Sequence, residues 1–165
     1  MKKSMPWIRC AGFLVGLAVI LGICDFCFAP SGYVRFILHE VNRKDTQYDT
    51  IILGASHARS AINPEYLDKE LGTNTLNLAI PGETVKDAYY LLKDACESND
   101  VKTVIMDVDY QYWMDEQPQG YFTEPFICQN ITNLKVKTEY LLDNWDTIDL
   151  RNVLVRRLSW DCTWS

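Results

Sequence analysis

The strongest constraint on the fold is an alternation of short apolar runs with amphipathic stretches in the middle of the chain. Thr50–Leu53 is a continuous apolar run that ends at Gly54, which is typical of a strand buried on both faces of a parallel sheet. Thr75–Ile80 and Lys102–Val108 predict two further strands. Because parallel strands need crossover connections, this order predicts an α/β fold with a three-layer α/β/α arrangement.

Helix start and stop residues mark the predicted crossovers. Asn63–Pro64 predicts the N-cap and the first residue of a helix that ends at Gly72. Thr84 and Asp87 have the spacing of a capping box, which predicts a second helix through about Ser98. The two helices fall between the predicted strands, as crossover helices would.

The alternation stops after the third strand. Tyr110–Phe126 is rich in aromatic residues, Gln and Pro, and predicts a long loop of the kind that often forms a lid or binding surface. Its aromatic side chains would either stack on sugar rings or pack over the core. Leu134–Asn144 and Thr147–Ser159 predict two more helices.

The N-terminal segment joins basic residues to an uncharged apolar run. Ala11–Cys24 spans about 21 Å as a helix, and extension through Ala29 gives about 28 Å, close to the thickness of a hydrocarbon core. Both a cleaved signal peptide and a signal-anchor have these features. Cys27-Phe28-Ala29 before Pro30 is a poor cleavage site, which favours a signal-anchor with its basic end inside.

The resulting organisation is a single-pass protein of the cell membrane whose bulk is extracytoplasmic. Residues 1–9 form the cytoplasmic N-terminus, 10–29 the transmembrane signal-anchor, 30–47 a link and 48–165 the exported domain. Apolar residues at helical spacing across Ser31–Val41 predict a helix in the link.

Composition excludes several classes of protein. A hydrophobic fraction of 48% with 23% charged residues excludes a disordered chain. From Pro30 onward the chain carries 13 basic and 21 acidic residues, a net charge of −8, so no nucleic-acid partner is expected.

Cysteine and histidine positions do not form a metal-binding pattern. Cys96, Cys128 and Cys162 lie in the exported part, so at most one disulfide forms there and the sequence does not select the pair. The two histidines, His39 and His57, lie far along the chain from any cysteine pair. No metal and no organic cofactor is expected.

Residues of the types that act in catalysis or ligand binding follow each predicted strand. Ser56 and His57 follow the first in Gly-Ala-Ser-His, Gly82 follows the second in Asn-Leu-Ala-Ile-Pro-Gly, and Asp107 and Asp109 close the third. Ligands bind beyond the carboxyl ends of parallel strands, so these residues predict a site at that edge. A serine at a tight strand-to-helix turn has backbone N–H groups beside it that can hold an oxyanion.

On these motifs, the segment from Tyr48 to about Met114 resembles the SGNH/GDSL hydrolase superfamily, and more narrowly its membrane-anchored bacterial members, including the type that acts in D-alanylation of lipoteichoic acid. The resemblance implies an SGNH/flavodoxin-like fold with Ser56 as nucleophile and Gly82 as an oxyanion-hole donor. It places Asp109 where the family carries an Asn side chain, and His57 as a supporting or substrate-contacting residue.

The family's Asp-x-x-His block, which supplies the general base and its orienting acid, is absent from this sequence. Since a serine hydroxyl needs a neighbouring base, either the chain is the N-terminal part of a longer enzyme or it does not hydrolyse by the family mechanism. The expected function is a membrane-anchored serine hydrolase or O-acyltransferase that acts on ester-linked acyl groups of cell-envelope glycans. Its partner would be a cell-envelope polysaccharide or acylated glycan. The alternative is a non-catalytic binding module of the cell envelope on the same fold.

Each candidate residue also has a structural interpretation. Ser56 would be the N-cap of a crossover helix, Gly82 a turn residue after Pro81, and Asp107 a strand-end residue without chemistry. A nucleotide-binding α/β domain is a further alternative, but Gly54-Ala55-Ser56 has one glycine where a phosphate-binding loop needs several.

Overall fold

The structure, a computed structural model, describes residues 6–27, 32–108 and 123–148. At its centre, β1 (Thr50–Leu53) lies between β2 (Thr75–Asn77) and β3 (Thr103–Met106), and both neighbours run parallel to it. Thr50 pairs with Thr75 on one side and with Thr103 on the other. The predicted α/β class with a parallel sheet is therefore confirmed.

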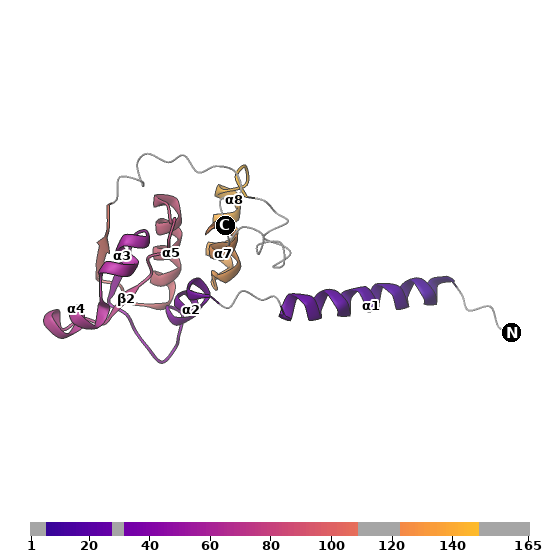
Figure 1. Cartoon of the computed structure of the whole chain (residues 1–165), viewed down its shortest axis with the longest axis horizontal. Helices are drawn as coiled ribbons and strands as arrows, with labels where there is room; N and C mark the ends of the chain where they lie inside the picture. The colour runs from indigo at the N-terminus through magenta and orange to yellow at the C-terminus, as the bar shows by residue number, and fades with distance from the viewer. Residues whose placement is uncertain (1–5, 28–31, 109–122, 149–165) are drawn as a thin grey trace.

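Helices cover both faces of this sheet (Figure 1). On one face lie α3 (Ser56–Ala61) and α4 (Pro64–Leu71), which pack around Ile52. The other face carries the larger part of the core, to which four helices contribute: α2 (Tyr33–Glu40), α5 (Val85–Ser98), α7 (Thr123–Asn130) and α8 (Leu134–Asp143).

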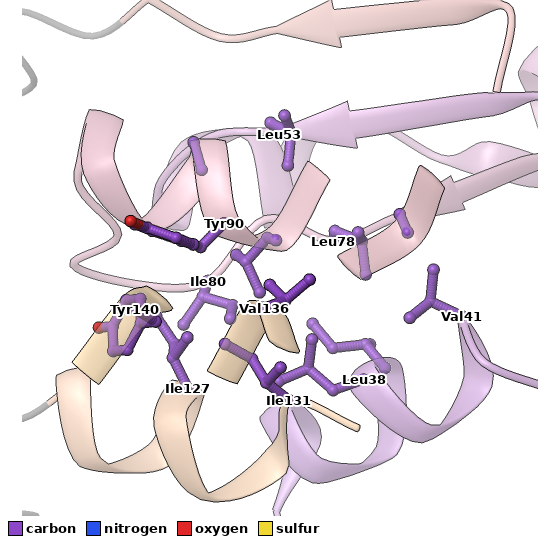
Figure 2. Packing of buried hydrophobic residues seen from close by; sticks show 14 of the residues in the cluster. Leu38, Val41, Leu53, Leu78, Ile80, Tyr90, Ile127, Ile131, Val136 and Tyr140 are labelled. Atoms are coloured by element: carbon purple, nitrogen blue, oxygen red, sulfur yellow. The ribbon is translucent and has the colours of Figure 1, made fainter. Parts of the chain in front are cut away.

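The larger core joins segments that are far apart in the sequence. Leu53 of β1 points into it, and Leu38 and Ile127 bring α2 and α7 together below the sheet (Figure 2). Tyr140 of α8 is fully buried and meets the ring of Tyr90 of α5 edge to face, with the ring centroids 5.2 Å apart. Burial of these side chains supplies most of the driving force for folding.

Local capping defines the ends of the crossover helices as the sequence predicts. The Asn63 side chain accepts a hydrogen bond from the Glu65 N–H at the start of α4, and Gly72 ends that helix with φ 68°. Thr84 and Asp87 form the reciprocal capping box of α5. Two predicted strands are too long, because the ladder of β2 ends at Asn77 and that of β3 at Met106.

One predicted loop is partly wrong. The loop expected over Tyr110–Phe126 gives way to α7, which begins at Thr123. Ile127 and Cys128 of this helix are fully buried, so tertiary packing rather than local sequence stabilises it. Residues 109–122 lie outside the described part of the chain, as do Asp109, Cys162 and most of the helix predicted over Thr147–Ser159.

The N-terminal helix, α1 (Pro6–Cys27), lies apart from the other elements (Figure 1). Its large apolar side chains are exposed, with Trp7 at 81% and Phe13 at 69% of full accessibility. Of the helices described, none combines the length and the apolar character that a membrane crossing requires.

The structure describes two of the three cysteines that follow residue 30. Cys96 is an exposed free thiol and Cys128 is buried, and the two do not form a disulfide with each other.

Candidate functional site

The exit of β1 is a point of close approach between three elements. Gly54 has φ 149°, and a Cβ at this position would lie 2.7 Å from the Ala58 Cβ and 2.8 Å from the Asp107 Cβ. Carbon atoms in contact normally lie about 3.5–4.0 Å apart. Only glycine lets α3 and the end of β3 come this close to the end of β1.

Ser56 is the first residue of α3, and its side chain is exposed. The N-cap of α3 is Ala55, which makes no side-chain capping bond, so the interpretation of Ser56 as an N-cap is wrong. The Ser56 N–H belongs to the first helical turn, whose N–H groups have no acceptor within the helix. Ser56 thus lies one residue beyond the strand-to-helix turn, at the carboxyl edge of the sheet.

His57 is also exposed and follows Ser56 on α3. Consecutive helical residues point in different directions, and side chains that face each other are three or four residues apart. His57 is therefore poorly placed to take a proton from its neighbour. His39, the other histidine, is exposed on α2.

Gly82 lies in a tight turn beside the exit of β1. The Glu83 N–H donates to the Ile80 carbonyl oxygen at 2.9 Å, and Gly82 has φ 75° after Pro81, as in a type II turn. The Ile80 N–H donates to the Gly54 carbonyl oxygen at 3.1 Å, which holds this turn against the β1 exit. The prediction that Gly82 is a turn residue is confirmed, and the turn lies at the predicted edge.

The third strand brings Asp107 to the same place. Its N–H donates to the Leu53 carbonyl oxygen at 3.0 Å, and its side chain is half-buried. Asp109, the other predicted site residue, is outside the described residues. Of the predicted residues, the structure thus gathers Ser56, Gly82 and Asp107 around Gly54.

Three residues at this edge were missed by the sequence analysis. Glu83 is buried, and its carboxylate accepts a hydrogen bond from the Ile80 N–H at 2.9 Å. The Arg59 guanidinium lies 4.1 Å from the centre of the Tyr33 ring. Burial raises the pKa of Tyr33, the Arg59 charge opposes that shift and the Glu83 charge adds to it, so both charges lie close to Tyr33.

Sequence signals for these residues are weak. Arg59 is three residues after Ser56, which places both on one face of α3. Glu83 directly follows a Pro-Gly turn. Tyr33 comes from α2, and its hydroxyl donates to the Asn77 carbonyl oxygen at 3.2 Å, a contact that only the tertiary fold creates.

Asn77 holds the edge together from the end of β2. The side-chain Nδ2 donates to the backbone carbonyl oxygens of Ala58 and Ile62 at 3.1 and 3.2 Å, and the side-chain Oδ1 accepts from the Ala79 N–H at 3.1 Å. These bonds fix the far end of α3 to β2. The orientation of α3, and hence of Ser56, depends on this side chain.

Comparison with known proteins does not assign a function to this site. No protein family, no curated protein and no solved structure matches the chain. Across residues 6–27, 32–108 and 123–148, no group of three or more His, Cys, Asp or Glu side chains is placed to hold a metal ion. The arrangement itself is an α/β sheet with a serine, a glycine turn and a carboxylate at its carboxyl edge.

Proposed function

We propose that this chain carries the nucleophile of a membrane-anchored, SGNH-type serine hydrolase or acyltransferase that acts on ester-linked acyl groups of cell-envelope glycans. The observation that carries the proposal is the convergence of three parallel strand ends around Gly54, where Ser56 is exposed and the Gly82 turn is held alongside. Ligand sites of open α/β sheets lie at this edge.

In the proposed reaction, the Ser56 Oγ attacks the carbonyl carbon of the bound ester. The Oγ–C bond forms, the C–O bond to the glycan breaks, and the serine proton passes through a base to the departing glycan oxygen. Backbone N–H groups of Ser56 and Gly82 stabilise the tetrahedral oxyanion. Water or a second hydroxyl group then takes the acyl group from Ser56.

The Ser56 hydroxyl needs a proton acceptor, which the Asp-x-x-His block supplies in SGNH hydrolases. The Asp-x-x-His block is absent, and His57 is adjacent to Ser56 on α3 rather than one turn away. The proposal therefore assigns Ser56 as the nucleophile and assigns the base to a group other than His57.

Attachment to the membrane is proposed for the N-terminal segment. The apolar side chains of α1 are exposed over residues 7–23, and the uncharged apolar sequence runs from Ala11 to Cys24. Exposed apolar surface of this extent is stabilised when it enters a bilayer. Alkaline carbonate washing tests this point: the protein should stay with the membranes, and release into the supernatant would contradict it.

A fluorophosphonate probe tests the serine. Native membranes that contain the protein are labelled, and the labelled species is identified by mass and by peptide mapping. Labelling at Ser56 should disappear in Ser56→Ala and persist in Ser60→Ala, an identical change at another exposed serine of α3. A labelled species heavier than 19.0 kDa would show that Ser56 belongs to a longer polypeptide.

The missing Asp-x-x-His block favours a second candidate, a non-catalytic binding module of the cell envelope on the same fold. An unlabelled 19.0 kDa protein that binds purified cell-envelope polysaccharide would establish this candidate. It would also refute the assignment of Ser56 as a nucleophile.

A further inference from the structure

The outer face of α2 carries a row of two arginines with a histidine between them. Arg35, His39 and Arg43 follow one another at intervals of four, so they line one side of the helix and the turn after it. All three are exposed. Ile37 and Leu38 occupy the opposite side and are buried in the core, so the outer face is free of the packing that holds α2 in place.

An aromatic residue lies beside this row. Phe36 is 64% exposed although it belongs to a helix that packs against the domain. With the row it lines a surface groove of about 530 Å³, whose described wall consists of Gly32, Arg35, Phe36, His39, Glu40 and Arg43. A basic row with one exposed aromatic is the composition of a surface that contacts lipid headgroups and inserts a ring between them.

The two arginines of the row differ in whether they already form ion pairs. The Arg43 guanidinium is held by Glu40 at 2.9 Å and by Asp45 at 2.7 Å. Arg35 forms no ion pair with any residue that the structure describes. In a chain with a net charge of −6, Arg35 is thus a local positive charge that can attract an anion, and the His39 ring lies four residues further along the same face.

The position of α2 in the chain brings this face close to α1. Five peptide units join Cys27, the last residue of α1, to Gly32 at the start of the groove. A chain of that length reaches at most about 18 Å. If α1 is embedded in a bilayer, the groove begins close to the headgroup layer.

We infer that the outer face of α2 binds the anionic phospholipid headgroups of the membrane that holds α1. Arg35 and His39 contact headgroup phosphates, and Phe36 inserts between them. The inference rests on the proposed membrane attachment of α1 and does not depend on the chemistry of Ser56. It would fix the orientation of the domain above the membrane, because α2 packs on the sheet that carries the strand-end site.

Arginine modification of the full chain in vesicles tests the inference. The protein is reconstituted into phosphatidylcholine vesicles that contain either no phosphatidylglycerol or about 30 mol% of this anionic lipid. Phenylglyoxal modification of Arg35 is then followed by peptide mass spectrometry, with the exposed Arg59 of α3 as the internal control. A contact with anionic lipid, which is worth about 1 kcal/mol per basic residue, should slow modification of Arg35 about fivefold. Modification of Arg59 should be unchanged.

The other outcomes distinguish failure of lipid binding by α2 from failure of membrane attachment by α1. Equal rates at Arg35 in both vesicles, with the protein still bound after a carbonate wash, would refute lipid binding by α2 while the attachment of α1 stands. Loss of the protein in the wash would refute the attachment itself. Protection of Arg35 by inorganic phosphate in phosphatidylcholine vesicles would identify a soluble anion as the ligand and overturn the lipid assignment. In Phe36→Ser, the slowing at Arg35 should weaken, whereas Tyr66→Ser, a matched change at an exposed aromatic of α4, should leave it intact.

Discussion

Replacement of Gly54 by alanine tests the geometry of the strand-end site most directly. Two costs combine at this position. A residue with a Cβ is strained at φ 149°, by about 1–2 kcal/mol. The same Cβ meets the Ala58 and Asp107 Cβ atoms at 2.7 and 2.8 Å, and relief of such overlap in a packed region costs a further ~1–3 kcal/mol. We expect Gly54→Ala to lower the free energy of unfolding by about 2–5 kcal/mol in total.

Gly72→Ala is the matched control. Gly72 also has a positive φ, 68°, but a Cβ there would meet no atom within 4 Å. Its substitution carries the backbone cost without the overlap, about 1–2 kcal/mol. The difference between the two variants therefore contains the overlap at Gly54 together with the difference in backbone strain between φ 149° and φ 68°.

Urea unfolding of the full chain in detergent, followed by circular dichroism, measures both variants. With a denaturant dependence of about 1–3 kcal/mol per molar urea, the midpoint of Gly54→Ala should lie about 1 M below that of Gly72→Ala. Equal midpoints would show that the three elements do not meet at Gly54, and the proposed site would lose its geometric basis.

Three further predictions concern groups away from the strand ends. Burial raises the pKa of Asp94, although hydrogen bonds to its carboxylate oppose the shift. The unfolded chain then loses this proton at a lower pH than the folded chain, so the Asp94 contribution to stability falls as the pH rises from about 3.9 through the folded pKa. The free energy of unfolding of Asp94→Asn relative to the wild type should accordingly rise over that range in urea titrations at a series of pH values. Tyr140→Phe removes a hydroxyl that donates to the buried Asp87 carboxylate at 2.8 Å, and should lower the free energy of unfolding by about 1–3 kcal/mol in the same assay. N-ethylmaleimide should modify the exposed Cys96 of the folded protein and reach the buried Cys128 only after unfolding, as peptide mass spectrometry will show.

Each of these expectations has a result that contradicts it. A stability difference for Asp94→Asn that does not change with pH would mean that the carboxyl group is not desolvated. An unchanged free energy of unfolding for Tyr140→Phe would mean that the hydrogen bond from Tyr140 to Asp87 does not stabilise the fold. Equal modification of the two cysteines in the folded protein would place Cys128 at the surface rather than in the core between α7 and its neighbours.

Part of the candidate site could be predicted from the sequence. The rule that ligands bind at the carboxyl edge of a parallel sheet depends on the strand order and not on how individual side chains pack. Ser56 and Gly82 follow consecutive strands, so their meeting at one edge follows from the strand order alone. The contact of Arg59 with Tyr33 did not follow, because Tyr33 of α2 reaches this edge only through tertiary packing. The collision that a side chain at Gly54 would cause is likewise invisible in sequence, since Asp107 is 53 residues away.

What the sequence by itself determined is local. The caps of α4 and α5 agree with the sequence prediction because each depends on side chains within a few residues of the backbone groups they bind. The bounds of β1 also agree, because its apolar run ends at Gly54. Tertiary structure alone decided the start of α7, whose local sequence predicted a loop, because Ile127 and Cys128 gain their stabilisation from contacts across the core. It also brought the Asn77 side chain, at the end of β2, to the carbonyl oxygens of Ala58 and Ile62. Short-range bonds can be read from neighbouring residues, whereas burial depends on which distant segments meet.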